Sequence, residues 1–316
     1  MSATRSLPVI CAIGFAALIV VGLLLPEWAM FLTTMAFAKG LVALGIVCLM
    51  RAGLVSFGQG LYFCIGAYVA GLMANWTGIT DIFLLTALGI IASGVTGLIF
   101  GPLLATYRGI FFAMLTLSLS MILYGFLSKM TALGGTDGLN VAAPTFLGYA
   151  PEGRALGLSL YVYTCAIVVV AGGLVRTFFD SERGLIALAI RDNELRVEYL
   201  GASVRKEIVF SYVAAGILGG IGGVISGLAI GHVDPETSYW TTSGEFVFVA
   251  ILSGYLSIPA VFVSSLLLEV VRSFSNLYFP NTWQLSLGIF LLAVILLLPN
   301  GLGSLLAWRK RRRETS

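Results

Sequence analysis

Residues 28–50 read WAMFLTTMAFAKGLVALGIVCLM, an apolar run with one charged side chain, Lys39, near its centre. An α-helix needs about 20 such residues to cross the hydrocarbon core of a bilayer, so this run predicts a transmembrane helix. Similar runs, separated by short polar breaks, continue along a chain that is 59% hydrophobic and only 10% charged. A soluble domain could not cover so much apolar surface. The composition therefore predicts an all-α integral membrane protein.

We expect about ten transmembrane helices, some of them broken or re-entrant. They are predicted at Pro8–Leu25, Trp28–Met50, Ser56–Asn75, Ile82–Leu104, Gly109–Ser128, Leu158–Phe179, Ile208–Gly231, Thr242–Leu256, Ala260–Asn276 and Trp283–Ala307. The eighth is short and interrupted by Gly and Ser, which favours a re-entrant or broken helix there. No linker divides the chain, so residues 1–316 form a single transmembrane domain.

The lysines and arginines predict the orientation of these helices. With the N-terminus inside, fourteen basic residues fall on the cytoplasmic side, including the cluster at residues 309–313, and only Lys129 and Arg154 fall outside. Cytoplasmic loops carry the excess of Lys and Arg, so both termini are expected in the cytoplasm. Residues 129–157 then form an outer (periplasmic) loop, and residues 180–207 form a cytoplasmic one.

Several functional classes find no support in the sequence. A net charge of +3 is too small and too local to suggest nucleic acid. The cysteines lie inside apolar runs without metal-ligand spacing, so we expect small core residues rather than ligands; they are Cys11, Cys48, Cys64 and Cys165. No clustered nucleophile and base suggests a membrane-embedded enzyme, and His232 is the only histidine. The chain also lacks a G-x-x-x-x-G-K-[ST] phosphate loop, so ATP would have to be bound by another subunit.

The cytoplasmic segment 181–207 reads SERGLIALAIRDNELRVEYLGASVRKE. Apolar residues recur in it at helical spacing, interleaved with charges of both signs, which is an amphipathic helical pattern. Asp192 and Asn193 can end one helix or cap the next, and Gly201 is suited to terminate a helix. Two interpretations remain open: a solvated connector on the membrane surface, or a short helix that docks into a soluble subunit and transmits its movement.

Charged residues inside the predicted spans need partners. Lys39 lies near the middle of the second span, where a charge costs about 2.5–3.5 kcal/mol on insertion scales. Glu245, in the outer part of the eighth span, and Glu269 are the candidate counter-charges. Glu269 and Arg272 have the i,i+3 spacing that would let them pair along one helix. Lys39 is therefore interpreted either as a structural ion pair or as a residue that lines the pore.

Uncharged polar residues in the spans are the other candidates for the solute pathway. They are Ser56, Gln59, Thr116, Ser118 and Ser120. Ser and Thr in membrane helices often bond to backbone, so a packing role is the alternative. The run Gly53–Gly60 interrupts helix at the inner boundary, and we expect it beside the cytoplasmic mouth of the path.

Six blocks of sequence, in order along the chain, carry a resemblance to a known family. They are GLVSFGQG at 53–60 with Gly66-Ala67-Tyr68, RGIFFAMLTL at 108–117, GGTDGL at 134–139, the loop 184–201 with AIRDNELR at 189–196, Ser243-Gly244-Glu245, and LPNGL at 298–302. In these blocks the chain resembles the membrane subunit of branched-chain amino acid ABC importers. It departs from the family at residues 253–260, SGYLSIPA, where relatives tend to carry a glycine-rich run.

The resemblance implies a permease subunit in the bacterial inner membrane that works with several partners. These would be a second, homologous permease subunit, two cytoplasmic ATPases that bind ATP and Mg²⁺, and a periplasmic solute-binding protein. The loop 184–201 would be the coupling helix seated in an ATPase; its candidate residues are Gly184, Arg191, Asp192, Asn193, Glu194, Leu195, Arg196 and Gly201. Gly135, Thr136 and Asp137 of the outer loop would contact the binding protein or form an outer gate.

The resemblance also implies the cargo. Branched-chain amino acids are expected first, and urea, short amides and aromatic acids are used by similar systems.

The alternative function is a secondary transporter driven by an ion gradient, for which a coupling carboxylate near the bilayer midplane is typical. Lys39 and Glu245 are the residues that would support this alternative.

Overall fold

The computed structural model describes residues 3–255, 257–278, 280, 282–297 and 301–303. The basic cluster 309–313 and the first three residues of the block 298–302 lie outside the described residues. The helices are α1 (Ala3–Leu24), α2 (Glu27–Arg51), α3 (Gln59–Thr77), α4 (Ile82–Leu104), α5 (Gly109–Lys129), α6 (Arg154–Asp180), α7 (Glu182–Asp192), α8 (Glu194–Tyr199), α9 (Val204–Ile230), α10 (Trp240–Ser253), α11 (Ile258–Tyr278) and α12 (Trp283–Leu297).

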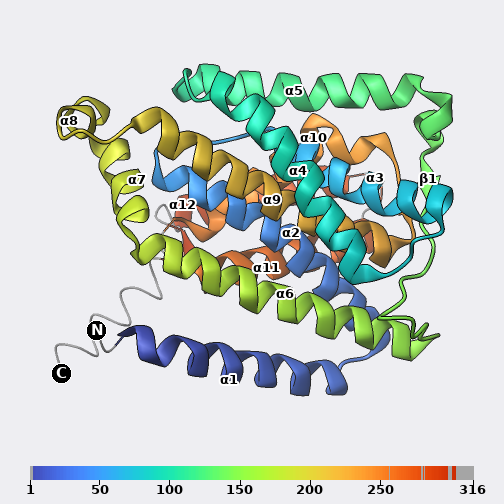
Figure 1. Ribbon diagram of the computed structural model, residues 1–316. Coiled ribbons are helices and arrows are strands. Elements are labelled where there is room, and N and C mark those ends of the chain that lie inside the picture. The colour runs from blue at the N-terminus through green and yellow to red at the C-terminus, as the bar shows by residue number, and fades with distance from the viewer. Residues whose placement is uncertain (1–2, 256, 279, 281, 298–300, 304–316) are drawn as a thin grey trace.

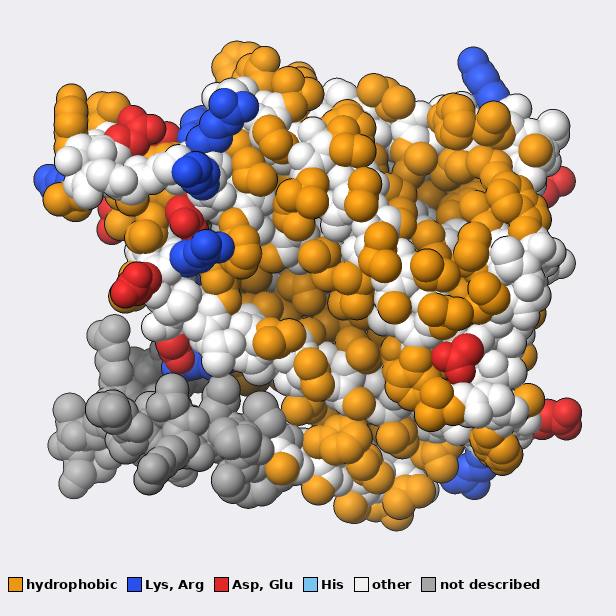
Figure 2. All heavy atoms as spheres, viewed as in Figure 1, with side chains coloured by type: hydrophobic (Ala, Val, Ile, Leu, Met, Phe, Trp, Pro, Cys, Tyr) orange, Lys and Arg blue, Asp and Glu red, His pale blue; other side chains and the backbone are white. Residues whose placement is uncertain are grey.

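Six of these helices are long and apolar enough to cross a membrane: α2, α4, α5, α6, α9 and α11. This finding confirms an all-α, multi-pass membrane protein. Figure 2 shows hydrophobic side chains over the middle of one face and most of the charged side chains at its two ends, as a bilayer belt requires. The total of about ten spans and the cytoplasmic placement of both termini stay predictions.

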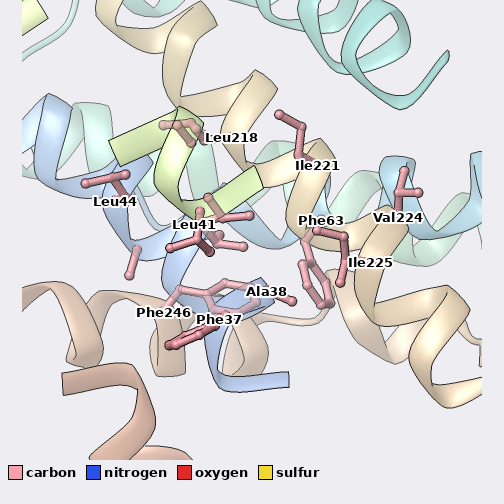
Figure 3. Close-up of a cluster of buried hydrophobic side chains, with 14 of the residues drawn as sticks. Phe37, Ala38, Leu41, Leu44, Phe63, Leu218, Ile221, Val224, Ile225 and Phe246 are labelled. Carbon is pink, nitrogen blue, oxygen red and sulfur yellow. The ribbon is translucent and has the colours of Figure 1, made fainter. Parts of the chain in front are cut away.

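Helix α9 forms the centre of the bundle and packs most extensively against α2, α3 and α4 (Figure 1). Side chains from these helices and from α10 meet in the buried cluster drawn in Figure 3, which includes Leu41, Phe63, Ile225 and Phe246. The α3 and α10 rings of Phe63 and Phe246 lie 5.1 Å apart between centroids. Helices α5 and α1 lie at the margins of the bundle in Figure 1.

Glycines let α9 approach its neighbours at backbone distance. A Cβ at Gly222 would collide with the carbonyl oxygen of Ala38 in α2, and one at Gly223 would collide with that of Phe63 in α3. A Cβ at Gly220 would collide with the Ser93 hydroxyl of α4. Close backbone approach through small residues is how membrane helices associate in the absence of a hydrophobic driving force.

Two helices begin inside the bundle rather than at its ends. Residues 52–58, between α2 and α3, are not helical, and Figure 1 shows α3 in the half of the bundle that holds β1 (Leu139–Asn140). Helix α10 has 14 residues. At 1.5 Å per residue it is about 21 Å long, too short to cross a hydrocarbon core of about 30 Å. The prediction of a broken or re-entrant eighth element is therefore confirmed.

Connections made of short 3₁₀ helices and strands join these elements at the end of the bundle opposite α7 and α8. The loop after α5 contains two short 3₁₀ helices, η1 (Thr131–Leu133) and η2 (Gly135–Asp137), followed by β1. β1 pairs antiparallel with β2 (His232–Val233), which directly follows α9. A third 3₁₀ helix, η3 (Pro235–Ser238), then leads back into the bundle to α10 and packs on α3 and α5.

Candidate functional site

The segment after α6 folds as two helices with a break where the sequence predicted one. Asn193 ends α7 and caps α8: its Oδ1 accepts a hydrogen bond from the Arg196 backbone N–H at 3.0 Å. Gly201 follows α8 with a φ of +89°, a left-handed conformation that favours glycine. Figure 1 shows the two helices protruding from one end of the bundle. The predicted cap and stop are both confirmed.

One face of this pair is buried and the other is open. Ile190 and Val197 are buried in a cluster with Leu54 of the 52–58 segment. On the opposite side Leu195 is 65% exposed, Tyr199 89% and Leu200 82%. The pair is thus anchored through one apolar face while it presents a second one outward. An exposed apolar patch rimmed by charges is typical of a protein interaction site.

Arg191 connects α7 to both discontinuous elements. Its guanidinium carbon lies 3.9 Å from the ring centroid of Tyr255, in the turn between α10 and α11. Its Cγ lies 3.3 Å from the place of a Cβ on Gly53, in the segment that leads to α3. A cation over an aromatic face is worth about 0.5–1 kcal/mol at an exposed site. The end of α7 therefore touches the chain before α3 and the chain after α10.

The remaining predicted coupling residues lie on the same protrusion. Glu194 forms an ion pair with Arg108, at the turn between α4 and α5. Asp192 and Arg196 are exposed. Gly184 is buried in the first turn of α7, where a Cβ would collide with the carbonyl oxygen of Phe178. Close approach between α7 and the end of α6 therefore requires glycine at this position.

The turn after α10 includes the residues that depart from the family pattern. α10 ends at Ser253, and Gly254 has a φ of +68°. Gly301, within the last sequence block, lies against this turn, since a Cβ on it would be 2.8 Å from the Gly254 nitrogen. The block at 298–302 thus packs on the α10 terminus through its described residues.

The starts of α3 and α10 meet inside the bundle. The Gly60 backbone N–H donates to the Ser243 hydroxyl at 3.0 Å, and the Ser120 hydroxyl donates to the Ser238 carbonyl at 2.7 Å. The Phe57 N–H donates to the Thr116 hydroxyl at 3.2 Å. Hydroxyls of α5 and α10 therefore bond backbone groups that a broken helix leaves unpaired. Ser118, by contrast, is exposed and bonds within its own helix.

Two pathway candidates beside this junction are fully buried. The Ser56 hydroxyl accepts a hydrogen bond from the Gly58 N–H at 3.2 Å. The Gln59 side-chain amide lies against Gly219 of α9, and neither its nitrogen nor its oxygen has a partner among the described residues. Leaving a buried amide without a hydrogen bond costs about 1–3 kcal/mol, so Gln59 is an unsatisfied polar group of this junction.

Lys39 belongs to a network of four charges that connects three helices. Its Nζ lies 2.7 Å from Glu269 Oε2 on α11 and 4.0 Å from Glu245 Oε2 on α10. Arg272 Nη1 of α11 lies 3.1 Å from the same Glu245 oxygen. The expected counter-charges of Lys39 are confirmed. Because Lys39 is the middle residue of α2, about 18 Å from either end, Glu245 lies deeper than the predicted outer position.

The glycine turn at residues 134–138 is packed against the chain that precedes α10. A Cβ on Gly138 would collide with the Val233 carbonyl of β2, and Gly135 is buried. Thr136 and Asp137 are exposed, and their side chains lie 3.4 Å apart. His232 Nδ1 lies 3.2 Å from Asn140 Oδ1, across the two strands. The predicted loop residues Gly135, Thr136 and Asp137 thus lie together at the end of α5, next to the turn at Gly138 that packs on β2.

Three of the contacts above were not predicted from the sequence. Tyr255 and Arg108 contact the α7–α8 pair from turns that are distant in the sequence, and Ser238 meets Ser120 across more than a hundred residues. For the Arg108 contact, the sequence signal was the placement of Arg108 in a block shared with a family. Among the cysteines, Cys48, Cys64 and Cys165 are free and buried, as expected of core residues.

Comparison with known proteins identifies relatives along most of the chain. Residues 28–298 match the family described as "Branched-chain amino acid transport system / permease component". The chain is 25% identical over 275 residues to the high-affinity branched-chain amino acid transport system permease protein LivM of Escherichia coli K12. That match covers 79% of this chain and 64% of LivM, somewhat less than two thirds of its length.

Two further relatives are also described as permease proteins of branched-chain amino acid transport. The LivM protein of Salmonella typhimurium is 24% identical, over 86% of this chain and 69% of its own. A probable branched-chain amino acid transport permease protein LivH of Methanocaldococcus jannaschii is 23% identical, over 87% and 91%. No solved structure matches the chain. Because the family match spans far more than half of its residues, this chain belongs to the branched-chain amino acid transport system permease family.

Proposed function

We propose that this chain is the permease subunit of an ATP-driven importer that moves branched-chain or related small amino acids or amides across the bacterial inner membrane. The observation that carries the proposal is the α7–α8 pair. It exposes Leu195, Tyr199 and Leu200 to a soluble partner, while Arg191 contacts the chain on either side of the broken elements. Family membership supports a transport component rather than an enzyme.

The proposed partners supply what this chain lacks. Two cytoplasmic ATPases bind ATP and Mg²⁺, a second homologous permease completes the pore, and a periplasmic binding protein delivers the solute. The α7–α8 pair seats in an ATPase, with Arg191, Asp192, Asn193, Glu194, Leu195 and Arg196 at the contact. When the ATPases close, α7 moves, and Arg191 passes the movement to residues 52–58 and to the turn after α10.

The starts of α3 and α10 are the part of the path that this movement opens. The backbone N–H groups of Phe57 and Gly60, at the start of α3, donate to the hydroxyls of Thr116 on α5 and Ser243 on α10, so a relative shift of α5 or α10 would release them. We assign Ser56, Gln59 and Thr116 to the lining of this junction. Lys39 and Glu245 connect α10 to the middle of α2. The exposed Thr136 and Asp137, at the end of α5, are assigned to the outer contact.

The test of this function is a charge placed on the exposed face of α8. Leu195→Asp should reduce ATP-dependent uptake by about tenfold or more, because burying an unpaired charge at an interface centre removes a contact worth 2 kcal/mol or more. The measurement is solute uptake and ATP hydrolysis by the complete assembly in proteoliposomes. Leu147→Asp, at a still more exposed leucine in the loop before α6, is the control and should leave uptake unchanged.

Arg191 allows a second arm of the same test. Arg191→Gln should raise the ATP hydrolysed per solute moved, while Arg191→Lys, which keeps a cation near Tyr255, should retain more of the coupling. Coupled uptake at the unaltered ratio in both Leu195→Asp and Arg191→Gln would contradict the proposal.

The four-charge network favours one alternative, a secondary transporter driven by an ion gradient. Intramembrane carboxylates such as Glu245 and Glu269 commonly serve as coupling sites. In vesicles that contain this chain without ATPases, the importer predicts no uptake under an imposed proton or sodium gradient. Gradient-dependent accumulation by the chain alone would favour the secondary transporter.

A further inference from the structure

The charge network has an inner pair and an outer pair that differ in exposure. Lys39 and Glu269 are 8% and 14% exposed, and their charged atoms lie 2.7 Å apart. Glu245 is also 14% exposed, but its partner Arg272 is 34% exposed. The network carries two positive and two negative charges, so it is neutral as a whole. The Arg272 side chain is thus the most exposed member of a charge-balanced network within the membrane helices.

Arg272 does not lie on the apolar outer surface of its helix. The exposed large side chains of α11 are Val263, Leu267, Phe274, Leu277 and Tyr278. Val263, Leu267 and Phe274 recur at helical spacing and form one stripe. Arg272 is two residues from Phe274, about 200° around the helix, and points toward α10. The Arg272 guanidinium therefore lies on the side of α11 where the helices of this network meet.

A partly exposed guanidinium at this depth is unfavourable against lipid. Charges within membrane helices face a bundle interior or a water-filled cavity, where they mark substrate paths. Glu245 and Arg272 present a carboxylate and a guanidinium 3.1 Å apart. An amino acid in water carries the complementary arrangement, an ammonium and a carboxylate on one carbon. A guanidinium binds a carboxylate through two parallel hydrogen bonds.

We propose that Glu245 and Arg272 line the solute path and form a transient site for a zwitterionic amino acid. Arg272 receives the solute carboxylate, and Glu245 receives its ammonium, so each solute charge replaces one partner of the resting pair. Lys39 and Glu269 hold Glu245 in place from the buried side, 4.0 Å from Lys39 Nζ. The site rests on the proposed importer function and specifies its substrate class, since a neutral amide would leave the pair uncompensated.

The test leaves the ion pair intact and reports on the space beside it. Thr241 lies four residues before Glu245, hence on the same face of α10, and is half-buried. Thr241→Cys is made in a variant whose native cysteines are replaced by alanine, and the complete assembly is exposed to a charged, membrane-impermeant methanethiosulfonate. Phe274→Cys, on the apolar stripe of α11, is the matched control.

Because only a hydrated thiolate reacts, the cysteine at 241 should be labelled at least about tenfold faster than the one at 274. Excess L-leucine should slow the labelling at 241, and 4-methylpentanoate, the same molecule without its amino group, should not. Adding Arg272→Gln should remove this protection but keep the labelling. Recovery of the assembled complex is measured for every variant.

Each outcome decides the proposal. Labelling at 241 as slow as at 274 would show that the pair does not line an aqueous path. Fast labelling that L-leucine does not slow, or that both compounds slow equally, would overturn the zwitterion site. None of these readouts depends on ATP hydrolysis. Normal coupling of both the Leu195→Asp and the Arg191→Gln variants would therefore refute the importer function separately from this site.

Discussion

At the residue scale, the glycines of α3 and α9 decide how the bundle packs. A Cβ on Gly66 of α3 would collide with the Gly220 carbonyl of α9, whereas Gly125 of α5 has no atom within 4 Å of a Cβ. A high glycine content, 38 of the 316 residues, favours close packing of membrane helices. It did not predict which helix each glycine faces, because that depends on neighbours that are remote in the sequence.

We therefore expect Gly66→Ala to separate α3 from α9 and to cost about 1–3 kcal/mol of stability, as overpacking of a tight contact does. Gly125→Ala should be neutral or slightly stabilising, because alanine favours helix more than glycine. Thermal unfolding of the purified protein in detergent measures both. Equal unfolding temperatures for the two variants would refute the close α3–α9 contact.

At the scale of elements, the α7–α8 pair depends on one side chain at its break. Asn193 caps α8 through its side-chain oxygen. Asn193→Ala should cost about 1 kcal/mol and loosen α8, while Asn193→Asp keeps a capping oxygen and should behave like the natural protein. Hydrogen exchange of the α8 amides measures the change. Faster exchange in both variants, or in neither, would argue against this cap.

The sequence predicted the break in this element and its C-terminal end from local chemistry. It also predicted that the eighth span is not an ordinary one. The sequence did not predict the contacts that connect these elements. Arg191 meets Tyr255 and Gly53 because α7 packs against α2 close to the turn after α10, and no local pattern encodes that approach.

At the scale of the whole molecule, the prediction concerns sidedness. Glu152 and Glu198 are both exposed, and they lie in the loop before α6 and in α8 respectively. In a cysteine-free variant on intact cells, Glu152→Cys should react with an impermeant maleimide, and Glu198→Cys should react only after permeabilisation. The reason is the excess of Lys and Arg on the α7–α8 side. The reverse pattern would invert the topology and remove α8 from the reach of any ATPase.

The sequence by itself determined the class of this protein. Long apolar runs leave a membrane as the only solvent that fits them, and the described part of the chain contains six helices with these properties. It also determined the family, through short blocks that keep their order along the chain. Both conclusions rest on patterns that are local, so they can be read without knowing which segments meet.

Only the tertiary structure decided what the polar residues inside the bundle do. Lys39, Glu245, Glu269 and Arg272 come from three helices, and the sequence offered more than one way to pair them. Their arrangement requires α10 to start within the bundle. The start of α10 is positioned in turn by η3 and by the paired strands β1 and β2. The position of a buried charge depends on all the side chains that pack around it, and these come together only when the chain is folded.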